Sequence, residues 1–483
     1  MIDHDHQARV IEFSDEAALL AALPLEAQDM HMPVVSVGGG ACGLSAALFL
    51  SDLGVASLVL ERDEVPSGSS ALSSGFVPAA GTAAQKAQGL EDTPEVFAHD
   101  NQDTAKGLAA PHLVAAYTQA IAKALDALGQ SHGFHWHVLD HFLYPGHRQY
   151  RMHALPSRTG QALMDQLQRA CQDKDIPVLT QSRVLELWVI KGTKRVGAVG
   201  FKRPNGHMEF VRMEALLLAC NGFGGNAQLV AECIPQMQQA TYAGHLGNDG
   251  SAILWGRALG AQTADLGAFQ GHGSWALPQG VLVTWALMMQ GGIQVNSLGQ
   301  RFHNESLGYS EASTEVLSQP HSKAFDVFDE PLLALARTFP DFCELERLNG
   351  VRRFDSVQAL AQWIACPALA LEQTLEGLRL RERGAPLGAG FEDERVFDRR
   401  LSLPLYAIEV TGALFHTQGG LEIDETCRVQ TLAHQALPNL WAGGGAARGV
   451  SGPAVWGYLS GNGLLSALAS AYIAARSIKQ FLL

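Results

Sequence analysis

The chain has 483 residues, of which 47% are hydrophobic and 17% are charged, a composition typical of a globular protein and not of a disordered one. This length exceeds one typical core and predicts two domains, or one large domain with an insertion. The formal net charge is −14, with no run of lysine and arginine, which argues against nucleic acid and anionic membrane surfaces as partners.

The cysteines and the apolar runs predict the compartment. The seven cysteines form no CxxC pair and no haem-attachment or zinc spacing, so we predict buried thiols in a reducing compartment and no metal site. Residues Met1 to Arg9 include two aspartates and lack the apolar core of a signal peptide. Apolar runs such as Val281 to Met289 are far shorter than the ~20 residues of a membrane span. These features predict a cytoplasmic protein with no membrane span.

The first predicted elements form a strand, turn, helix and strand. Before this unit, the pattern of residues 1–32 predicts a short helical leader. Pro33 to Val37 has the pattern of a buried strand, Cys42 to Leu53 that of a helix, and Ser57 to Leu60 that of a second strand. Two strands joined by a helix in this way predict a parallel sheet.

The remainder of the chain predicts a nucleotide-binding fold with an insertion. Amphipathic helices are predicted at 108–130 and 160–173, and strands at 178–191, 195–201, 208–212 and 215–219. From about 267 to 412 glycine is scarcer and strands mix with helices, and the last part of the chain returns to strand, glycine loop and helix. We therefore predict an α/β fold in which a Rossmann-type domain, 1–266 and 413–483, carries an inserted α+β cap (substrate) domain, 267–412.

The turn after the first buried strand is rich in glycine. Residues 38–43 read Gly-Gly-Gly-Ala-Cys-Gly and match GxGxxG at Gly38, Gly40 and Gly43. The first glycine permits the tight turn, the second lets the backbone approach a pyrophosphate, and the third lets helix and strand pack closely, with the phosphates at the positive end of the helix. Glu61 ends the next strand, where an acidic side chain binds ribose hydroxyls. Together these features predict a dinucleotide site.

Four further segments resemble one flavoprotein family. They are Ser67 to Phe76 (SGSSALSSGF), Ala215 to Asn226 (ALLLACNGFGGN), Leu440 to Gly445, and Gly457 to Leu464. In this order they resemble the flavin-binding segments of the fumarate reductase/succinate dehydrogenase flavoprotein superfamily, which includes the ketosteroid dehydrogenases. The resemblance runs over nearly the whole chain after residue 33. It implies FAD as the cofactor, and the first segment lacks the histidine that links the flavin covalently in some relatives, so we expect non-covalent FAD.

The glycine turn and the resemblance together assign a set of residues to the FAD site. These are Gly38, Gly40, Cys42, Gly43, Glu61, Arg62, Ser69, Ser70, Ser73, Ser74, Gly75, Val184, Asn221, Gly222, Gly444, Gly461, Asn462 and Leu464.

Two histidines and one tyrosine bear on the substrate. The segments around His272 and His416 resemble the two sites at which fumarate reductases hold a substrate carboxylate with a histidine. The arginine acid of fumarate reductases follows the motif Gly-x-Arg-Phe-x-Asn-Glu, present here at 299–305, and its position is Tyr309 in this chain. The loop 449–463, which carries a second family arginine, contains no arginine. Tyrosine has neither the permanent cation nor the forked donors of arginine, so the dicarboxylate clamp is missing.

The ketosteroid dehydrogenases fit this substitution better. They have a tyrosine at the position of Tyr309, and residues 457–461 (GYLSG) resemble the Gly-Tyr-Val-Ser-Gly of the 4-ene-forming (5α) branch. The resemblance implies that Tyr309 is the base or a proton relay, that Tyr458 donates to the ketone carbonyl together with the Gly461 N–H, and that Ser460 assists proton removal. The division of these roles stays open. A hydrogen bond to the carbonyl lowers the cost of the enolate while hydride passes to flavin N5.

Three functions follow from these observations. The first is an FAD-dependent desaturase of a cyclic ketone, such as a 3-ketosteroid or an oxocyclohexane. The second, favoured by His272 and His416, is a reductase or dehydrogenase of a small dicarboxylate or enoate. The third is a flavin-binding electron-transfer or sensor subunit with no substrate of its own. The partners expected are a small ketone or carboxylated substrate and an electron acceptor, which the sequence leaves open between a quinone, oxygen and a flavoprotein.

Overall fold

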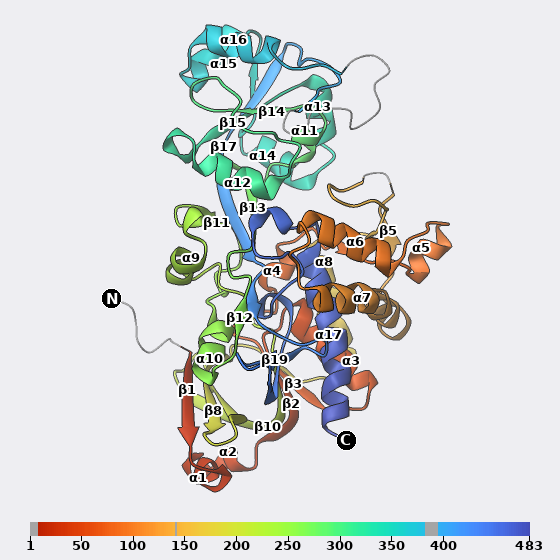
Figure 1. Ribbon diagram of the computed structural model, residues 1–483, viewed down its shortest axis with the longest axis vertical. Coiled ribbons are helices and arrows are strands. Elements are labelled where there is room, and N and C mark those ends of the chain that lie inside the picture. The colour runs from red at the N-terminus through yellow and green to blue at the C-terminus, as the bar shows by residue number, and fades with distance from the viewer. Residues whose placement is uncertain (1–7, 141–142, 382–394) are drawn as a thin grey trace. The chain divides into compact units, whose positions relative to one another are not determined.

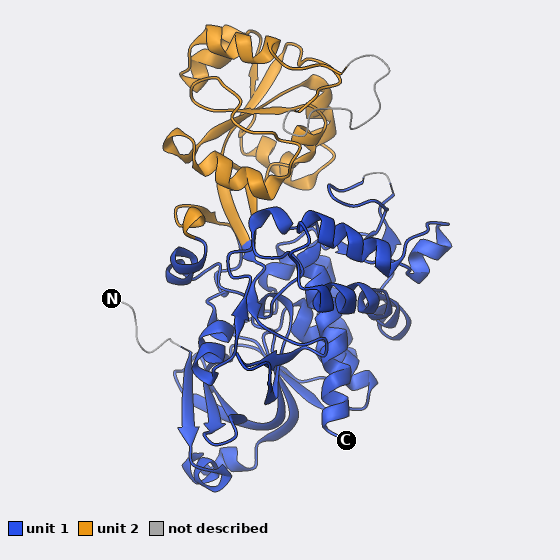
Figure 2. Ribbon diagram, in the orientation of Figure 1, with its two compact units in different colours: residues 1–234, 244–269, 416–483 blue, residues 235–243, 270–415 orange. Residues whose placement is uncertain are grey.

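The computed structural model describes residues 8–140, 143–381 and 395–483 and divides them into two compact units. Unit 1 comprises residues up to 234 together with 244–269 and 416–483, and unit 2 comprises 235–243 and 270–415 (Figure 2). The chain thus passes between the units at four points, and the large excursion of 270–415 from unit 1 is that of an inserted domain.

The centre of unit 1 is a large mixed sheet. Its strands run in the order β1-β8-β9-β10-β2-β3-β7, and β20 pairs with the second half of β10 and with β19. The strands β2, β3 and β7 and the end of β10 are parallel, and residues 34–37, 57–60 and 215–218 of these strands are buried and mostly aliphatic. The strands of unit 1 are β1 Arg9–Phe13, β2 His31–Val37, β3 Ser57–Leu60, β4 Val77–Pro78, β5 His137–Val138, β6 Met152–Ala154, β7 Val178–Leu179, β8 Arg183–Ile190, β9 Arg195–Lys202, β10 Met208–Leu218, β12 Thr263–Ala264, β18 Gly420–Leu421, β19 Arg428–Gln430 and β20 Ala436–Ala442.

Helices cover this parallel part of the sheet. Helix α3 is buried from Ala41 to Leu50 because it lies between the sheet and its helical neighbours α8 and α17 (Figure 1). Helix α17 packs in turn on α7, so one apolar core joins these helices to β2, β3 and β10. The helices of unit 1 are α1 Glu16–Ala22, α2 Leu25–Gln28, α3 Ala41–Asp52, α4 Gly68–Ala71, α5 Ala83–Ala87, α6 Pro94–Thr104, α7 Pro111–His132, α8 Gly160–Asp173, α9 Ala227–Cys233, α10 Ser251–Leu259 and α17 Asn462–Phe481.

The prediction of a helical leader was wrong in part. The described residues before β2 contain the two short helices α1 and α2, but they begin with the strand β1, which pairs in parallel with β8 at the edge of the large sheet. In β1 the residues Val10, Ile11 and Phe13 are partly buried, and Ile11 and Phe13 pack on a small cluster around Trp188. The sheet edge stabilises this segment as a strand, which its local pattern does not reveal.

Two predicted strand boundaries were also wrong. Residues 208–212 and 215–219 belong to one strand, β10, which pairs first with β9 and then with β20. Glu214, between the two predicted strands, has a half-exposed side chain that pairs with Arg195, so its charge does not interrupt β10. Conversely, the segment predicted as one strand, 178–191, contains two strands, β7 and β8. Gln181, between them, has a φ of 53°, a left-handed conformation that interrupts an extended strand.

Unit 2 has its own sheet and two apolar cores. The antiparallel strands β14, β15 and β17 form its centre, with β11, β13 and β16 also paired to β17. One core gathers around Phe328 and Phe342, and the other around Phe325 and Leu371. The elements are β11 Thr241–Tyr242, β13 Phe269–Ala276, β14 Ile293–Val295, β15 Ala324–Asp329, β16 Arg352–Phe354, β17 Leu405–Thr417, α11 Ala286–Met289, α12 Tyr309–Leu317, α13 Glu330–Ala336, α14 Pro340–Arg347, α15 Val357–Ile364 and α16 Ala368–Glu376.

Within the described ranges, no helix combines the length and apolar character needed to cross a bilayer. The predicted domain limits and the cytoplasmic location stay predictions.

Candidate functional site

The glycine turn joins β2 to α3 and leaves the start of the helix open. Gly38 has a φ of 107°, and a Cβ on Gly43 would lie 1.9 Å from the Gly38 carbonyl oxygen, so both positions require glycine. A Cβ on Gly40 would meet only the Ser70 hydroxyl, at 3.8 Å. No described side chain caps Gly40, the N-cap of α3. The positive end of the α3 dipole and the room beside Gly40 fit the pyrophosphate of FAD.

Glu61, at the end of β3, holds this turn. Its buried carboxylate accepts the Gly39 N–H at 2.7 Å and the Asp63 N–H at 2.8 Å. Burial raises the pKa of Glu61, and the two backbone hydrogen bonds oppose that effect. Each carboxylate oxygen can accept a further bond, so Glu61 retains the capacity to take a ribose hydroxyl.

The serine-rich segment meets the end of β10 through hydrogen bonds. The Ser69 hydroxyl accepts the side-chain amides of Asn221, at 3.1 Å, and Asn248, at 2.9 Å. Asn221 has a φ of 65°, and its side-chain oxygen accepts the Gly222 N–H at 2.8 Å. Three polar side chains therefore converge beside the glycine turn. Asn248 belongs to no motif that the sequence reveals.

Other predicted FAD residues shape the same region. The Ser70 hydroxyl accepts the Ala41 N–H of α3 at 3.2 Å, and the Ser73 hydroxyl accepts the Gly75 N–H at 3.1 Å. A Cβ on Gly75 would lie 2.6 Å from the Thr159 carbonyl oxygen. Of the other predicted residues, Ser74 is exposed and Val184 is buried within β8. Arg62 pairs with Asp63 and Asp249 and donates to the Gly247 carbonyl oxygen, next to Asn248.

A second open helix start lies at the C-terminal end of the chain. Gly461, with a φ of 91°, precedes α17, and no described side chain caps it. Asn462 is fully buried, and its side-chain oxygen has no hydrogen-bond partner among the described residues. Gly444 lies against Cys42, and burial raises the pKa of the Cys42 thiol to about 12. Leu464 is buried in the core of unit 1. The amides of α17 and the unpaired Asn462 oxygen fit a polar flavin edge.

In unit 2, His272 and Tyr309 lie together. Tyr309 is the first residue of α12, and its ring stacks on His272 of β13 with centroids 5.0 Å apart and planes at 20°. Trp285 meets the same imidazole edge-on, and Phe415 stacks on it. The His272 Nδ1 accepts the Ser274 N–H at 3.0 Å, and burial lowers the pKa of His272 to about 3. His272 is therefore neutral, with its hydrogen on Nε2.

In unit 1, His416 and Tyr458 lie together near the start of α17. Their rings meet edge-on at 5.8 Å, and a Cβ on Gly463 would lie 3.0 Å from the imidazole. Desolvation lowers the pKa of His416 to about 4. The Ser460 carbonyl oxygen accepts a hydrogen bond from Nε2 of the buried His147 at 2.9 Å. A Cβ on Gly461 would lie 2.6 Å from the Pro78 side chain, so this position requires glycine. The predicted catalytic residues thus form two groups, one in each unit.

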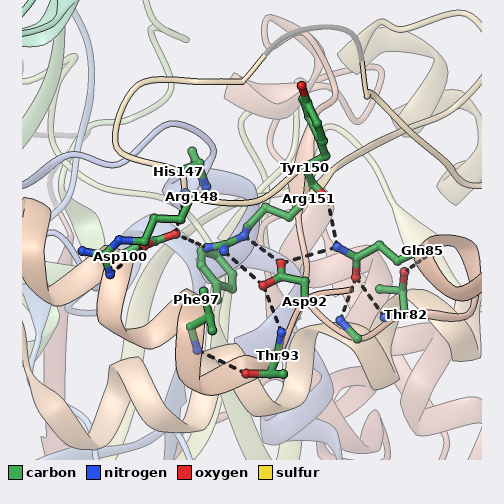
Figure 3. A network of polar contacts seen from close by, with 12 residues as sticks. Thr82, Gln85, Asp92, Thr93, Phe97, Asp100, His147, Arg148, Tyr150 and Arg151 are labelled. Carbon is green, nitrogen blue, oxygen red and sulfur yellow. Dashed lines mark hydrogen bonds and ion pairs between the residues drawn. The ribbon is translucent and has the colours of Figure 1, made fainter. Parts of the chain in front are cut away.

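A buried ion-pair network is centred on Arg151 (Figure 3). Arg151, with a fully buried side chain, pairs with Asp92 and Asp100 and lies over the Phe97 ring at 4.5 Å. His147 lies four residues before Arg151 in the chain, and burial lowers its pKa to about 3. It is therefore a neutral hydrogen-bond donor to the Ser460 carbonyl oxygen. Sequence reasoning missed His147 and Arg151, because no local pattern distinguishes them from surface residues.

Comparison with known proteins identifies the fold and the cofactor. A family model described as FAD binding domain matches residues 33–464. The chain belongs to this family. It is 27% identical over 439 residues to a probable fumarate reductase of Shewanella frigidimarina, across 89% of this chain and 72% of that protein.

Two solved structures share the fold of this family member. One is the open conformation of a flavocytochrome c3 fumarate reductase, with a TM-score of 0.79, 24% identity, and 96% of this chain and 80% of that chain covered. The other is a 3-ketosteroid-Δ4-(5α)-dehydrogenase from Rhodococcus jostii in complex with 4-androstene-3,17-dione, with a TM-score of 0.73, 23% identity, and 93% and 97% covered. The predicted α/β fold with its cap and the predicted superfamily are confirmed, and the protein is an FAD-dependent oxidoreductase.

Replacing Glu61 by alanine is expected to raise the Kd of FAD about 10–100-fold, since hydrogen bonds to a charged group contribute about 1.5–3 kcal/mol. The variant loses both the ribose acceptor and the bonds that hold Gly39 and Asp63. Titration of apoprotein with FAD, followed by flavin fluorescence, measures the change. Glu64→Ala, at an exposed neighbouring position, is the matched control and should bind FAD as the parent does. Equal affinities of the two variants would refute the role of Glu61.

Proposed function

We propose that this oxidoreductase is a desaturase that introduces an α,β-double bond into a cyclic ketone. The observation that carries the proposal is the pair formed by Tyr309 and the neutral His272, with ring centroids 5.0 Å apart. Tyr309 stands at the position where the resemblance implies the arginine acid of a fumarate reductase. A phenol at the start of α12 has an O–H that can give up and take back a proton, whereas a guanidinium stays protonated.

The ion pairs of three arginines support a ketone over a dicarboxylate. Arg301 and Arg395 both bind the buried carboxylate of Glu305. Burial alone would raise the pKa of Glu305, but the hydrogen bonds and charges of these two arginines outweigh it and hold the pKa below its usual value. Arg448, beside the loop 449–463, pairs with Asp265 and Glu422. Each of these guanidinium groups is already bound to a carboxylate of the chain, which supports a ketone over a substrate with a second carboxylate.

The roles of the side chains follow from their chemistry. Bound FAD supplies an acceptor for the hydride from the β carbon. Tyr309 accepts or relays the proton from the α carbon, and one face of its ring is covered by His272, which itself packs against Trp285 and Phe415. Tyr458 donates to the carbonyl oxygen, where negative charge develops as the proton leaves, and Ser460 assists the transfer.

A second candidate is the reduction of a small enoate or dicarboxylate. It is favoured by the two neutral histidines, because the Nε2–H of His272 and an imidazole N–H of His416 are suitable donors to a carboxylate. The relative from Shewanella is named a probable fumarate reductase, which is in keeping with this candidate.

Anaerobic spectroscopy separates these functions. Oxidised protein is mixed with 3-ketosteroids and oxocyclohexane derivatives, and with saturated dicarboxylates, while bleaching of the flavin is followed. Photoreduced protein is mixed in parallel with fumarate and other enoates, and reoxidation is followed. Bleaching by a cyclic ketone supports the proposal. Reoxidation by enoates, with all ketones inert, would replace it by the second candidate, and silence in both arms would indicate a flavin-binding subunit without a substrate of its own.

A further inference from the structure

A buried chain of hydrogen bonds connects the start of α17 to His416. The side-chain amide of Asn462 donates to the Ser451 hydroxyl at 3.1 Å, and Ser451 donates to the side-chain oxygen of Gln418 at 2.9 Å. The side-chain nitrogen of Gln418 lies 2.8 Å from the Nδ1 of His416. Asn462, Ser451 and Gln418 are all buried and all lie in unit 1.

The direction of this chain determines where His416 carries its hydrogen. An amide nitrogen only donates, so Ser451 accepts from Asn462 and uses its single hydrogen toward Gln418. The Gln418 oxygen is then the acceptor of that bond, and its NH₂ group faces His416. The Nδ1 of His416 also lies 3.3 Å from the Thr417 carbonyl oxygen, but its contact with the Gln418 NH₂ group is shorter, at 2.8 Å. An NH₂ group only donates, so Nδ1 offers it a lone pair, which leaves the hydrogen of the neutral imidazole on Nε2.

Gln418 is rigid enough to impose this arrangement. Its backbone N–H donates to the Ala268 carbonyl oxygen at 2.8 Å, and its own carbonyl oxygen accepts the Gly449 N–H at 2.9 Å. The imidazole is confined as well, by Tyr458 on one side and by the backbone at Gly463 on the other. Because both its backbone and its side-chain oxygen are held by hydrogen bonds, Gln418 keeps its NH₂ group directed at His416.

We propose that Gln418 is a positioning residue, held by Ser451 and Asn462, which fixes His416 in the neutral tautomer with hydrogen on Nε2. His416 then offers one hydrogen-bond donor and no acceptor to a bound molecule. The group that it recognises is therefore a hydrogen-bond acceptor, the oxygen of a ketone or of a carboxylate, and not an N–H or O–H donor. The statement about the bound molecule rests on the proposed function, while the statement about the tautomer rests on the geometry alone.

The first test is nuclear magnetic resonance of the oxidised holoenzyme labelled with ¹³C at histidine Cε1 and ¹⁵N in the ring. The signal of His416 is the one lost in His416→Asn. We expect the nitrogen shifts of the tautomer with hydrogen on Nε2, unchanged across the neutral pH range. Hydrogen on Nδ1 would overturn the inference. This measurement needs no substrate, so it decides the tautomer even if no ketone reduces the flavin.

The second test is Gln418→Glu. A carboxylate only accepts hydrogen bonds, so it draws a proton onto Nδ1 and stabilises the imidazolium, and the titration of His416 should move up by roughly 1–3 pH units. Tyr458 is the titratable side chain that faces His416, while Gln418, Ser451 and Asn462 are neutral. At pH below the raised pKa the imidazolium keeps its Nε2–H. Above it the neutral ring carries hydrogen on Nδ1 and loses the outward donor, so binding of a ketone or carboxylate should weaken as pH rises.

Two further variants make the result specific. Gln418→Met keeps the volume but removes both hydrogen bonds, and it should weaken binding of such a ligand about two- to tenfold at every pH, since one hydrogen bond contributes about 0.5–1.5 kcal/mol. Gln435→Glu introduces the same charge at an exposed position of unit 1 and should leave the His416 signal and ligand binding unchanged. Ligand binding is measured by perturbation of the flavin spectrum. Two outcomes would overturn the positioning role. In the first, His416 of Gln418→Glu titrates at the same pH as in the parent; in the second, ligand binding to this variant does not weaken as pH rises.

Discussion

Replacing Tyr309 by phenylalanine is expected to slow ketone-driven flavin reduction by ~10²–10⁴-fold, the usual contribution of a positioned acid or base. Phenylalanine keeps the ring that stacks on His272 and packs against the core of unit 2, so only the phenolic oxygen is lost. Because that oxygen acts mainly in the transition state, the affinity for the ketone should change much less than the rate. Anaerobic stopped-flow reduction over a range of ketone concentrations separates the two quantities.

Two variants serve as controls for this result. Tyr406→Phe removes a phenol of the same unit whose hydroxyl binds Glu330, and its reduction rate should stay close to that of the parent. Tyr309→Arg restores the residue type implied for fumarate reductases but should not restore ketone activity, because a guanidinium does not accept a proton at neutral pH. If Tyr309→Phe reduces its flavin at the parent rate, Tyr309 has no part in proton transfer.

Replacing Arg151 by methionine is expected to lower the free energy of unfolding by about 3–5 kcal/mol, the usual cost of removing one partner of a buried ion pair. The Arg151 side chain is fully buried, and its Nε lies 2.9 Å from Asp92 while its Nη1 lies 2.9 Å from Asp100. Methionine fills a similar volume but removes the cation that pairs with the buried Asp92, while Asp100 keeps its ion pair with the half-exposed Arg148. Urea denaturation of the holoenzyme in excess FAD, followed by circular dichroism, measures the change.

Arg148 provides a matched control on the same acid. Its guanidinium also lies beside Asp100, at 3.3 Å, but its side chain is half exposed. Exposed ion pairs contribute about 0–1 kcal/mol, so Arg148→Met should be nearly as stable as the parent. Adding Asp92→Asn to Arg151→Met removes one uncompensated charge and should recover part of the loss. Equal destabilisation by Arg148→Met and Arg151→Met would show that burial of the charge is not the cause.

The cofactor fold was predictable from sequence because its signals are local. In the turn at 38–43, Gly38 needs a backbone that other residues rarely adopt, and Gly43 needs the absence of a Cβ. The strands on either side are continuous aliphatic runs because both faces of a parallel sheet are covered. The strand at β1 was missed for the opposite reason: its pairing with β8 is a contact between residues distant in the chain.

The arrangement around the predicted catalytic residues depends on tertiary structure. Sequence resemblance named His272, Tyr309 and His416, but only the fold stacks Tyr309 on His272 and leads from Asn462 through Ser451 and Gln418 to His416. Glutamine, serine and asparagine are common on surfaces and in turns, and nothing in their spacing reveals that they are buried and bonded to one another. The pKa values of both histidines are lowered by burial, which is a property of the packed structure. The sequence by itself determined the cofactor fold through backbone conformation and apolar patterning, whereas the tautomers and charge states of the candidate site were decided by the packing of residues far apart in the chain.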